Sequence, residues 1–427
     1  MLSGKMPDIP SGIKYALYLH FPFCSSKCTF CQQFSCAVTG NKHYKAYTDI
    51  LCREIELYAS RLCGAEIAGL YFGGGTPVLF DLEKVCGTIA GKLKLCSPFF
   101  FNVEATPYAL TKEKLRVLKN MGVTRLCVGL QSLDPRVLKA INRPVSQITM
   151  FPEIYNEALQ IGLDNICAEL VCGLPEQTPE SFIKDLEYLV SLHPAGIHIY
   201  RFMRSPATFL FRTAGPQTEK EMLATKNMYN AGFDILKKSG YKYYGDDFTA
   251  DARHRNPQIH QQERYHVFSS LIGIGLSALG EIRLSSGVLK TANVRGWKKY
   301  SSMISGQKLP IDRACVLDTK DELIRARIIH MAIFGRLTRG ELFDLVPDAD
   351  SSLMGLCEQF NNEFQFLKTA GKIEIADDFS EIKWNTADLN WFKIFYSPAV
   401  LERCITAMKN KSFLSDFQHR FRLGIDC

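Results

Sequence analysis

Three cysteines stand close together near the amino terminus, in the segment CSSKCTFC, which places Cys24, Cys28 and Cys31 within eight residues. Cysteine thiolates bind zinc and iron–sulfur clusters. On a four-iron cube, three protein thiolates would leave one iron without a protein ligand, and catalysis at a metal requires such an open position. A half-built zinc site, or three core cysteines that happen to lie close together, would explain the same spacing.

The other twelve of the fifteen cysteines are scattered singly through apolar surroundings. Disulfides are typical of small secreted domains, and the opening residues MLSGKMPDIPSGIK lack the apolar stretch of a secretory signal. We therefore expect these twelve cysteines to be reduced core residues, and the protein to be cytoplasmic. No segment approaches the roughly 18 uncharged apolar residues of a membrane helix, so we expect no membrane span.

Short apolar runs alternate with longer amphipathic stretches, and this alternation predicts a parallel sheet with covering helices. No G-x-G-x-x-G follows the first run, so a Rossmann sheet is not favoured. We expect an α/β fold in which residues 1–14 lead into a partial (β/α)6 TIM-type barrel over residues 15–247. The expected strands are residues 15–21, 68–74, 99–105, 124–130, 165–173 and 196–202, with a helix near 218–239 and a further strand at 241–245.

The three cysteines directly follow the first expected strand, where a βα loop opens on the carboxyl-terminal face of a barrel, the usual place of catalysis. Residues 248–427 have a looser pattern, and we expect a smaller, mainly helical, winged-helix-like domain there, with helices near 319–334, 338–346 and 351–371. Lysine plus arginine exceed aspartate plus glutamate by 51 to 44. This excess forms no basic run, so we expect no nucleic-acid partner.

The segment YLHFPFCSSKCTFC, residues 18–31, closely resembles the signature of a group of radical S-adenosylmethionine (SAM) enzymes. This group contains oxygen-independent coproporphyrinogen III oxidase (HemN) and its relatives. The resemblance continues through GGGTP at 73–77, VEATP at 103–107, GLQS at 129–132, the pair Asn142–Arg143 and GLPEQTPES at 173–181. It is strong over residues 15–245 and looser beyond them.

The resemblance implies that Cys24, Cys28 and Cys31 ligate a catalytic [4Fe–4S] cluster and that SAM chelates the fourth iron, with one or two SAM molecules bound. It implies that His20 supports the cluster loop by a hydrogen bond. The chemistry is suitable, because glycines admit a ligand close to the backbone, and carboxylates, amides and guanidinium groups can bind the polar groups of SAM. Several of these residues also have an interpretation without a cofactor. Glu104, Gln131 and Glu169 could cap backbone groups at strand ends. Arg143 could be a surface cation, and Phe30 an ordinary core aromatic. The implied SAM- or cluster-contacting residues are Tyr18, Phe30, Gly73, Gly74, Gly75, Thr76, Glu104, Gln131, Arg143 and Glu169.

The relatives divide into porphyrinogen decarboxylases, class C methyltransferases that use two SAM molecules, and haem chaperones. Gln33 stands where the decarboxylases usually carry a further cysteine, and few residues precede the first strand. Glu169 stands where the family usually has aspartate. The region of His254, His260 and His266 matches the H-N-x-x-Y-W motif of the chaperones poorly, and we expect these to be exposed loop histidines.

Our first hypothesis is an enzyme that abstracts hydrogen from a tetrapyrrole, close in type to coproporphyrinogen III oxidase. The alternatives are a class C methyltransferase acting on an aromatic, quinone or haem-like substrate, and a haem chaperone. We expect the protein to be a monomer with a small-molecule substrate, and to receive electrons from a donor such as flavodoxin or ferredoxin.

Overall fold

The computed structural model describes residues 14–62, 64–244, 247–250, 270–284, 287–317, 336–338, 361–378 and 381–384. The chain divides into two compact units. The first comprises Met1–Tyr243 and Asp247–Val316, and the second comprises Tyr244–Asp246 and Leu317–Cys427. None of the described helices has both the length and the apolar character needed to cross a lipid bilayer.

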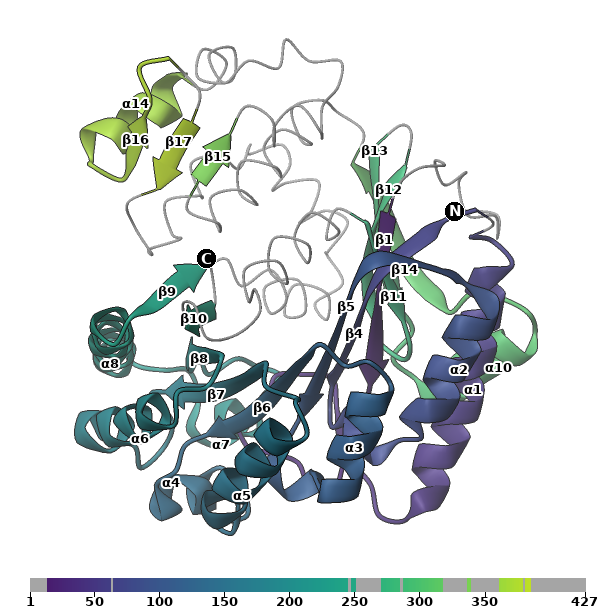
Figure 1. The fold of residues 1–427 in the computed structure, drawn as a ribbon, viewed down its shortest axis with the longest axis horizontal. Coiled ribbons are helices and arrows are strands. Elements are labelled where there is room, and N and C mark those ends of the chain that lie inside the picture. The colour runs from purple at the N-terminus through teal and green to yellow at the C-terminus, as the bar shows by residue number, and fades with distance from the viewer. Residues whose placement is uncertain are drawn as a thin grey trace. The chain divides into compact units, whose positions relative to one another are not determined.

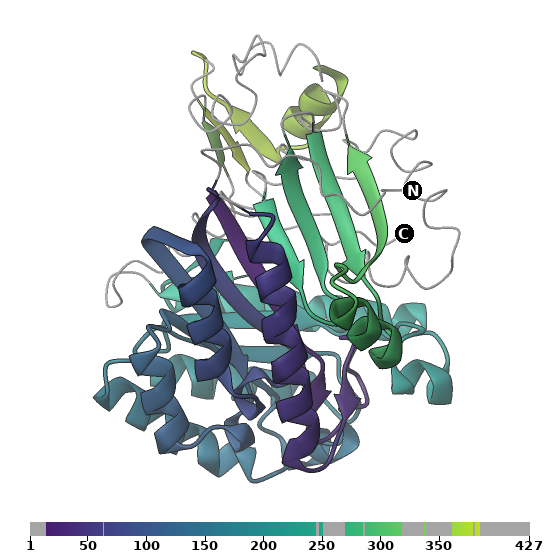
Figure 2. The ribbon, with the colours of Figure 1, turned by 90° about the vertical axis from the view of Figure 1, so that its right-hand side faces the viewer.

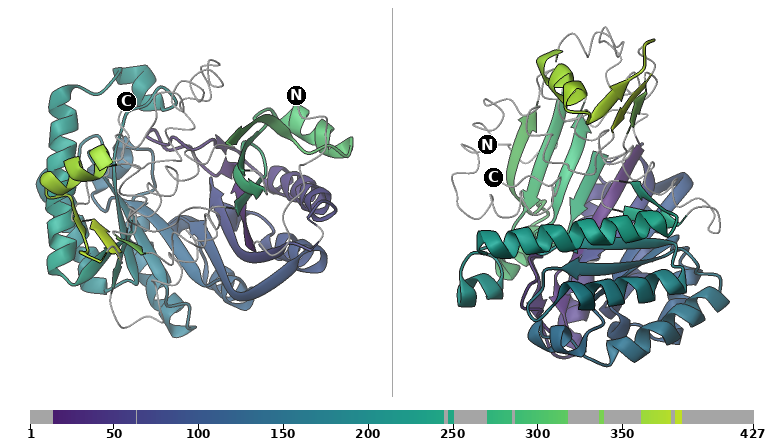
Figure 3. Two further views of the ribbon diagram at one scale, coloured as in Figure 1. Left: turned by 90° about the horizontal axis from the view of Figure 1, so that it is seen from above. Right: turned by 90° about the vertical axis from the view of Figure 1, so that its left-hand side faces the viewer.

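Six parallel strands form the centre of the first unit, in the order β1-β4-β5-β6-β7-β8 (Figure 1). Helices lie along the outer side of this curved sheet (Figure 3). The expected partial (β/α)6 barrel is therefore confirmed. The strands are β1 Lys14–Phe21, β4 Glu66–Gly74, β5 Lys94–Ala105, β6 Arg125–Gln131, β7 Ile166–Cys172 and β8 Gly196–Arg201. The helices are α1 Asn41–Ala59, α2 Leu82–Lys92, α3 Lys112–Asn120, α4 Pro135–Ala140, α5 Gln147–Gln160, α6 Pro179–Leu192, α7 Phe209–Ala214 and α8 Glu219–Lys238, and the 3-10 turns are Pro77–Leu79 and Pro107–Ala109.

Each barrel strand has an apolar outer face and a polar inner face, because successive side chains of a strand point to opposite sides. On β1, Leu17 and Leu19 pack in the main hydrophobic core, whereas Tyr18 and His20 face the other way. The same alternation places polar side chains from neighbouring strands side by side on the inner face. They are Tyr71, Asn102, Glu104, Arg125, Cys127, Cys167, Glu169, His198 and Tyr200.

The sheet continues beyond the barrel strands on both sides. Strand β10 (Asp247–Ala250) pairs antiparallel with β8, and β9 (Tyr241–Tyr244) lies beyond it. On the other edge, β11 (Leu271–Ile274) pairs parallel with β1, and β12, β13 and β14 follow it (Figure 2). The expected domain boundary after residue 247 thus falls within the first unit, because β10–β14 belong to the same sheet. The remaining elements here are β12 Leu279–Leu284, β13 Gly287–Asn293, α10 Trp297–Ser305 and β14 Ile311–Leu317.

A buried carboxyl group connects α1 to this sheet extension. Glu54 has no exposed surface, and its carboxylate accepts hydrogen bonds from the Gly275 N–H (2.8 Å), Asn293 Nδ2 (3.0 Å) and the Tyr300 hydroxyl. Burial raises the pKa of Glu54 to about 8. The neighbouring Tyr47 hydroxyl donates to the carbonyl of His20 at 2.6 Å. These contacts join Gly275, Asn293 and Tyr300 to α1, and Tyr47 joins α1 to β1.

The described part of the second unit is small. It contains α14 (Asn361–Thr369) and an antiparallel sheet in the order β15-β17-β16. Helix α14 lies within the helix expected at 351–371, whereas those expected near 319–334 and 338–346, and the histidines at 254, 260 and 266, lie outside the described residues. The strands are β15 Arg336–Thr338, β16 Ile373–Ile375 and β17 Glu381–Trp384.

Candidate active site

The three clustered cysteines lie on a closed loop at the carboxyl end of β1. We call residues 24–36 the cluster loop. Its ends are joined by a short parallel pair of strands, β2 (Phe23–Cys24) and β3 (Cys36–Ala37). The Val38 N–H donates to the carbonyl of Cys24 at 3.0 Å. Cys24, Cys28 and Cys31 are half-buried free thiols.

Segments far away in the sequence fix the middle of the cluster loop. The Thr29 N–H donates to the carbonyl of Ile141 at 3.2 Å, and Asn142 Nδ2 donates to the carbonyl of Lys27 at 2.9 Å. Asn142 has a φ of 58°, a left-handed conformation that asparagine tolerates better than most residues. From a third direction, the Leu210 N–H donates to the carbonyl of Thr29 at 3.2 Å.

Cys24 lies against Gly73–Gly75 at the end of β4, which we call the glycine strip. The Gly75 N–H donates to the carbonyl of Phe21 at 2.6 Å, and the Thr76 N–H donates to that of Phe23 at 3.1 Å. A Cβ atom on Gly75 would lie 3.0 Å from Cys24 Sγ. Burial raises the pKa of the Cys24 thiol to about 11, although a hydrogen bond with the Thr76 side chain lowers it.

His20 joins the glycine strip to the far end of the cluster loop. Its Nε2 lies 2.7 Å from the carbonyl oxygen of Phe34. A carbonyl only accepts, so Nε2 carries the proton, and Nδ1 accepts from the Tyr18 hydroxyl at 2.8 Å. Gly74 has a φ of 108°, and a Cβ atom there would lie 2.6 Å from His20 Nδ1. His20 thus makes a hydrogen bond to the cluster loop, as the sequence led us to expect.

Glu104, at the end of β5, contacts the same glycine strip. Its Oε2 accepts from the Gly74 N–H at 3.1 Å, and its Oε1 accepts from the Tyr71 hydroxyl at 2.5 Å. A Cβ atom on Gly73 would lie 3.0 Å from Glu104 Cδ. The rings of Tyr71 and Tyr18 are 5.6 Å apart between centroids. Tyr18, Glu104 and the glycines therefore form one continuous group.

Arg143 lies beside a cluster cysteine. Its Nε donates to Cys28 Sγ at 3.4 Å, and its NH1 donates to the carbonyl of Gly129 at 2.6 Å. Burial alone would lower the pKa of the guanidinium, but the nearby Cys28, Tyr108 and Cys31 side chains together outweigh this effect, so the pKa is raised. The alternative of a surface cation therefore does not describe Arg143, which touches the cluster loop directly.

Gln131 and Glu169 approach each other beside Gly129. A Cβ atom on Gly129 would lie 2.6 Å from Gln131 Nε2 and 3.5 Å from Glu169 Oε2. Gln131 has a φ of 70° and is 8% exposed, and its buried Oε1 has no hydrogen-bond partner among the described residues. Glu169 Oε1 lies 3.4 Å from both His198 Nδ1 and the Tyr200 hydroxyl. The longer side chain at position 169 thus reaches the neighbouring strand.

Phe30 occupies a different environment from the polar candidates. It is half-buried against a small apolar cluster beneath the cluster loop, as in the alternative of an ordinary core aromatic. A contact between Phe30 and SAM stays a prediction. The residues of the apolar cluster are Val137, Leu138, Ile141, Val171, Leu174 and Phe202.

The residues fit the two cofactors that the sequence suggested. No three histidine, cysteine, aspartate or glutamate side chains in the described ranges converge to hold a single metal ion. A four-iron cube does not need such convergence, because each thiolate binds a different iron atom. The unpartnered Oε1 of Gln131 could accept a hydrogen bond from a bound hydroxyl or ammonium group, as a buried polar atom requires.

Several residues of this region were not predicted as parts of the site. Lys27, whose Nζ donates to the carbonyl of Ser35 at 2.7 Å, ties the cluster loop to itself. Tyr71, His198 and Tyr200 lie on the inner face, and the alternation in GLYFGG and GIHIYRF was the signal that could have found them.

Seven cysteines outside the trio are free thiols in the described part of the chain, but not all of them are core residues. Cys52, Cys127, Cys167 and Cys172 are buried. Cys36 is exposed, contrary to the expectation, because it closes the cluster loop at the surface.

Comparison with protein families and solved structures agrees with this geometry. Residues 18–189 match the profile of the radical SAM superfamily. This range includes the cluster loop, the glycine strip and all the other candidate site residues. The chain aligns with the solved structure of coproporphyrinogen III oxidase (HemN) of Escherichia coli over 91% of each chain, with a TM-score of 0.75 and 22% identity. The two proteins share a fold.

Curated relatives fall into two functional groups. An oxygen-independent coproporphyrinogen III oxidase of Helicobacter pylori is 28% identical over 345 residues, which cover 76% of this chain and 73% of the relative. The heme chaperone HemW of Buchnera aphidicola is 29% identical over 296 residues, which cover 68% of this chain and 76% of the relative. Residues 18–189 therefore form a radical SAM domain, and the HemN oxidases and HemW chaperones are homologues of this chain.

Proposed function

We propose that this protein is a radical SAM enzyme that abstracts hydrogen from a tetrapyrrole, close in type to the coproporphyrinogen III oxidases. The observation that carries the proposal is the cluster loop itself. Three free thiols lie at the carboxyl end of β1, and the first of them lies against the glycine strip. Its neighbour Cys28 accepts a hydrogen bond from Arg143. Relatives named as oxygen-independent coproporphyrinogen III oxidases support the choice of substrate class.

The residues of the chain have distinct roles in this proposal. Cys24, Cys28 and Cys31 hold a [4Fe–4S] cluster, and the glycines allow SAM to lie close to the backbone. A cluster and SAM held by these residues would supply the chemistry of hydrogen abstraction through a 5′-deoxyadenosyl radical. SAM contacts are assigned to Tyr18, Phe30, Gly73, Gly74, Gly75, Thr76, Glu104, Gln131, Arg143 and Glu169.

Arg143 and Glu169 also act on the protein itself. Arg143 donates a hydrogen bond from Nε to the Cys28 sulfur, and so helps to hold this proposed cluster ligand in place. Glu169 contacts His198 and Tyr200 on β8. Through these contacts its carboxylate can orient both side chains on the inner face of the barrel, where a substrate would lie.

Anaerobically reconstituted protein incubated with coproporphyrinogen III and SAM tests the proposal. Release of carbon dioxide together with 5′-deoxyadenosine is expected. The absence of both would contradict the proposal. S-adenosylhomocysteine formed beside 5′-deoxyadenosine would instead identify a class C methyltransferase.

The similarity to HemW makes a haem chaperone the second candidate. Stable stoichiometric haem binding without substrate-dependent SAM cleavage would support the chaperone and exclude the enzyme. Every assay includes two cysteine variants. Cys31→Ala removes one proposed cluster ligand and should abolish activity. Cys36→Ala removes an exposed cysteine of the same loop and should leave activity unchanged.

A further inference from the structure

The segment that follows β8 packs on the cluster loop. The Leu210 N–H at the start of α7 donates to the carbonyl of Thr29, which lies between the second and third clustered cysteines. The side chain of Gln32 donates through Nε2 to the carbonyl of Met203. Leu210 also packs, like Phe30, against the apolar cluster below the loop. Helix α7 therefore lies against the loop that carries the three clustered cysteines.

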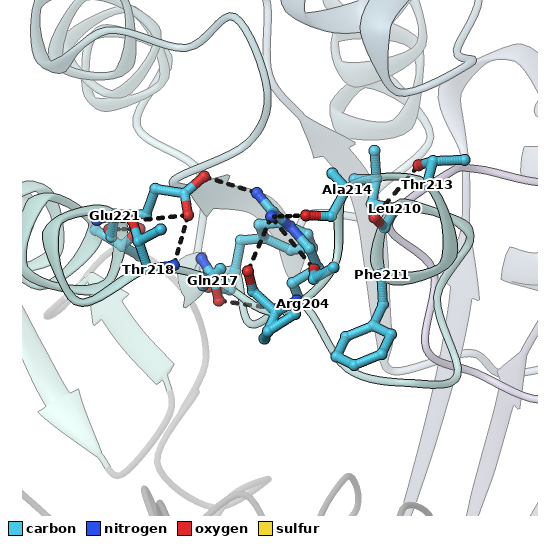
Figure 4. Close-up of polar contacts among 12 residues, drawn as sticks. Arg204, Leu210, Phe211, Thr213, Ala214, Gln217, Thr218 and Glu221 are labelled. Carbon is cyan, nitrogen blue, oxygen red and sulfur yellow. Dashed lines mark hydrogen bonds and ion pairs between the residues drawn. The ribbon is translucent and has the colours of Figure 1, made fainter.

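One arginine closes this segment into a compact loop. The Arg204 guanidinium lies between the carbonyl groups at the end of α7 and the carboxylate of Glu221 on α8 (Figure 4). Its NH1 donates to the carbonyls of Ala214 and Gly215, both at 3.3 Å, and its NH2 lies 2.8 Å from Glu221 Oε1. The Arg204 N–H donates to Gln217 Oε1 at 2.8 Å. These bonds tie the segment that precedes α7 to the carboxyl end of α7 and to α8.

The three segments that meet here have an unusual charge composition. They are residues 22–46, 135–143 and 203–215, and we call them together the cluster face. The whole chain has 44 acidic residues, but these three segments have none. They carry eight basic residues: Lys27, Lys42, Lys45, Arg136, Lys139, Arg143, Arg204 and Arg212.

Part of this positive charge is available to a partner. Arg136 pairs with Asp134, and Arg204 pairs with Glu221. Arg143 contacts the cluster loop, and the half-buried Lys27 donates to Ser35. The remaining exposed cations are Lys42, Lys45, Lys139 and Arg212. Phe209, which is 51% exposed at the start of α7, adds an apolar side chain to the helix that carries Arg212.

We propose that the cluster face is the docking surface for an acidic one-electron carrier protein of the flavodoxin type. The inference rests on the proposed function, which requires one electron for each SAM cleaved. In this step the carrier is oxidised by one electron and the cluster is reduced by one, and no covalent bond of the chain changes. Electron transfer requires the carrier to come close to the cluster. Opposite charge guides such encounters and raises their rate.

A charge-reversal pair tests this proposal. The docking variant is Lys139→Glu with Arg212→Glu. The control is Lys92→Glu with Lys237→Glu, which changes the net charge equally in the exposed last turns of α2 and α8. Those turns lie at the opposite end of the barrel, because each helix runs antiparallel to the strand before it. Thermal unfolding of all variants checks that the fold is kept.

Flavodoxin binding is measured first, by titration with the purified proteins. The docking variant is expected to weaken the affinity by about tenfold or more, and the control by less than about twofold. The affinity of the wild-type protein should also fall as salt is added. Equal affinities of the docking variant and the control, or a wild-type affinity that salt does not change, would overturn the proposal.

Formation of 5′-deoxyadenosine is then compared with reduced flavodoxin and with dithionite as the electron source. The docking variant should lose activity only with flavodoxin. A loss of activity with dithionite, or a raised KM for the tetrapyrrole, would instead show that the exposed cations bind substrate, and would contradict carrier docking. No SAM cleavage by the wild-type protein with dithionite would refute the proposed function, which separates that failure from a failure of docking.

Discussion

Replacing Gly75 by alanine should disturb the proposed cluster site directly. A Cβ atom there would lie 2.7 Å from the carbonyl oxygen of Phe23, 2.8 Å from that of Phe21 and 3.0 Å from Cys24 Sγ. Two of these three atoms are backbone oxygens, which cannot rotate away as the end of a side chain could. Either the strand after Phe21 or the Cys24 sulfur must therefore move.

The size of the effect follows from these contacts. Adding one methyl group to a tightly packed site costs about 1–3 kcal/mol. If the two segments moved apart to remove the clash, the hydrogen bonds that Gly75 and Thr76 donate to Phe21 and Phe23 would break. Each of these bonds is worth about 0.5–1.5 kcal/mol. We therefore expect Gly75→Ala to lower the free energy of unfolding by about 1–3 kcal/mol, and to reduce iron binding because Cys24 is displaced.

Urea unfolding measures the stability, and iron and sulfide analysis after anaerobic reconstitution measures cluster binding. The matched control is Gly87→Ala in α2. A Cβ atom there has no neighbour within 4 Å, and the exchange should stabilise the helix by up to about 1 kcal/mol. A Gly75→Ala protein with wild-type stability and iron content would refute the close contact between the glycine strip and Cys24.

Two further predictions concern buried side chains. His20→Ala should cost about 1–3 kcal/mol of unfolding free energy, because the Phe34 carbonyl and the Tyr18 hydroxyl both lose their partner. Tyr18→Phe removes only one of these hydrogen bonds and should lower the unfolding free energy by less. Equal stabilities of the two variants in urea would contradict the two hydrogen bonds assigned to His20. Burial raises the pKa of Glu54 from 4.5 to about 8, so the folded state favours the protonated form. The stability it contributes is full below about pH 4.5 and is lost as the pH rises to about 8, by at most about 1.4 kcal/mol per pH unit. The unfolding free energy of Glu54→Gln, measured in urea, should change less with pH over this range than that of the wild-type protein. An unchanged pH dependence would exclude Glu54 as its cause.

The barrel strands were predictable because each has a short apolar run bounded by turn residues. Five of the six lie within two residues of their expected positions, and β5 begins five residues early, at Lys94. Strand β11 is not among the expected strands, because the glycines in SSLIGIGLSALG interrupt its apolar run and loosen the pattern. In the structure, a Cβ atom on Gly273 would lie 2.2 Å from the carbonyl of Leu279, and one on Gly275 would lie 2.6 Å from the Tyr47 hydroxyl. These glycines permit close packing of β11 against its neighbours.

The site was predictable where it is local in the sequence. The cluster loop and the glycine strip are contiguous motifs, and both lie at strand ends as expected. The contacts of Arg143 with Cys28 and of Glu169 with His198 join distant segments. The second contact depends on the register that pairs Glu169 with His198 across β7 and β8. No periodicity within a single segment contains that information.

The iron content of anaerobically reconstituted protein tests the proposed cluster most directly. Wild-type protein and Cys36→Ala should each bind about four iron and four sulfide per chain, with the visible absorbance of a cluster. The three variants that each lack one proposed ligand should bind much less iron and sulfide and lose most of this absorbance. They are Cys24→Ala, Cys28→Ala and Cys31→Ala. Wild-type protein that binds no cluster, or a Cys31→Ala protein that keeps a full one, would contradict the assignment of these three thiols.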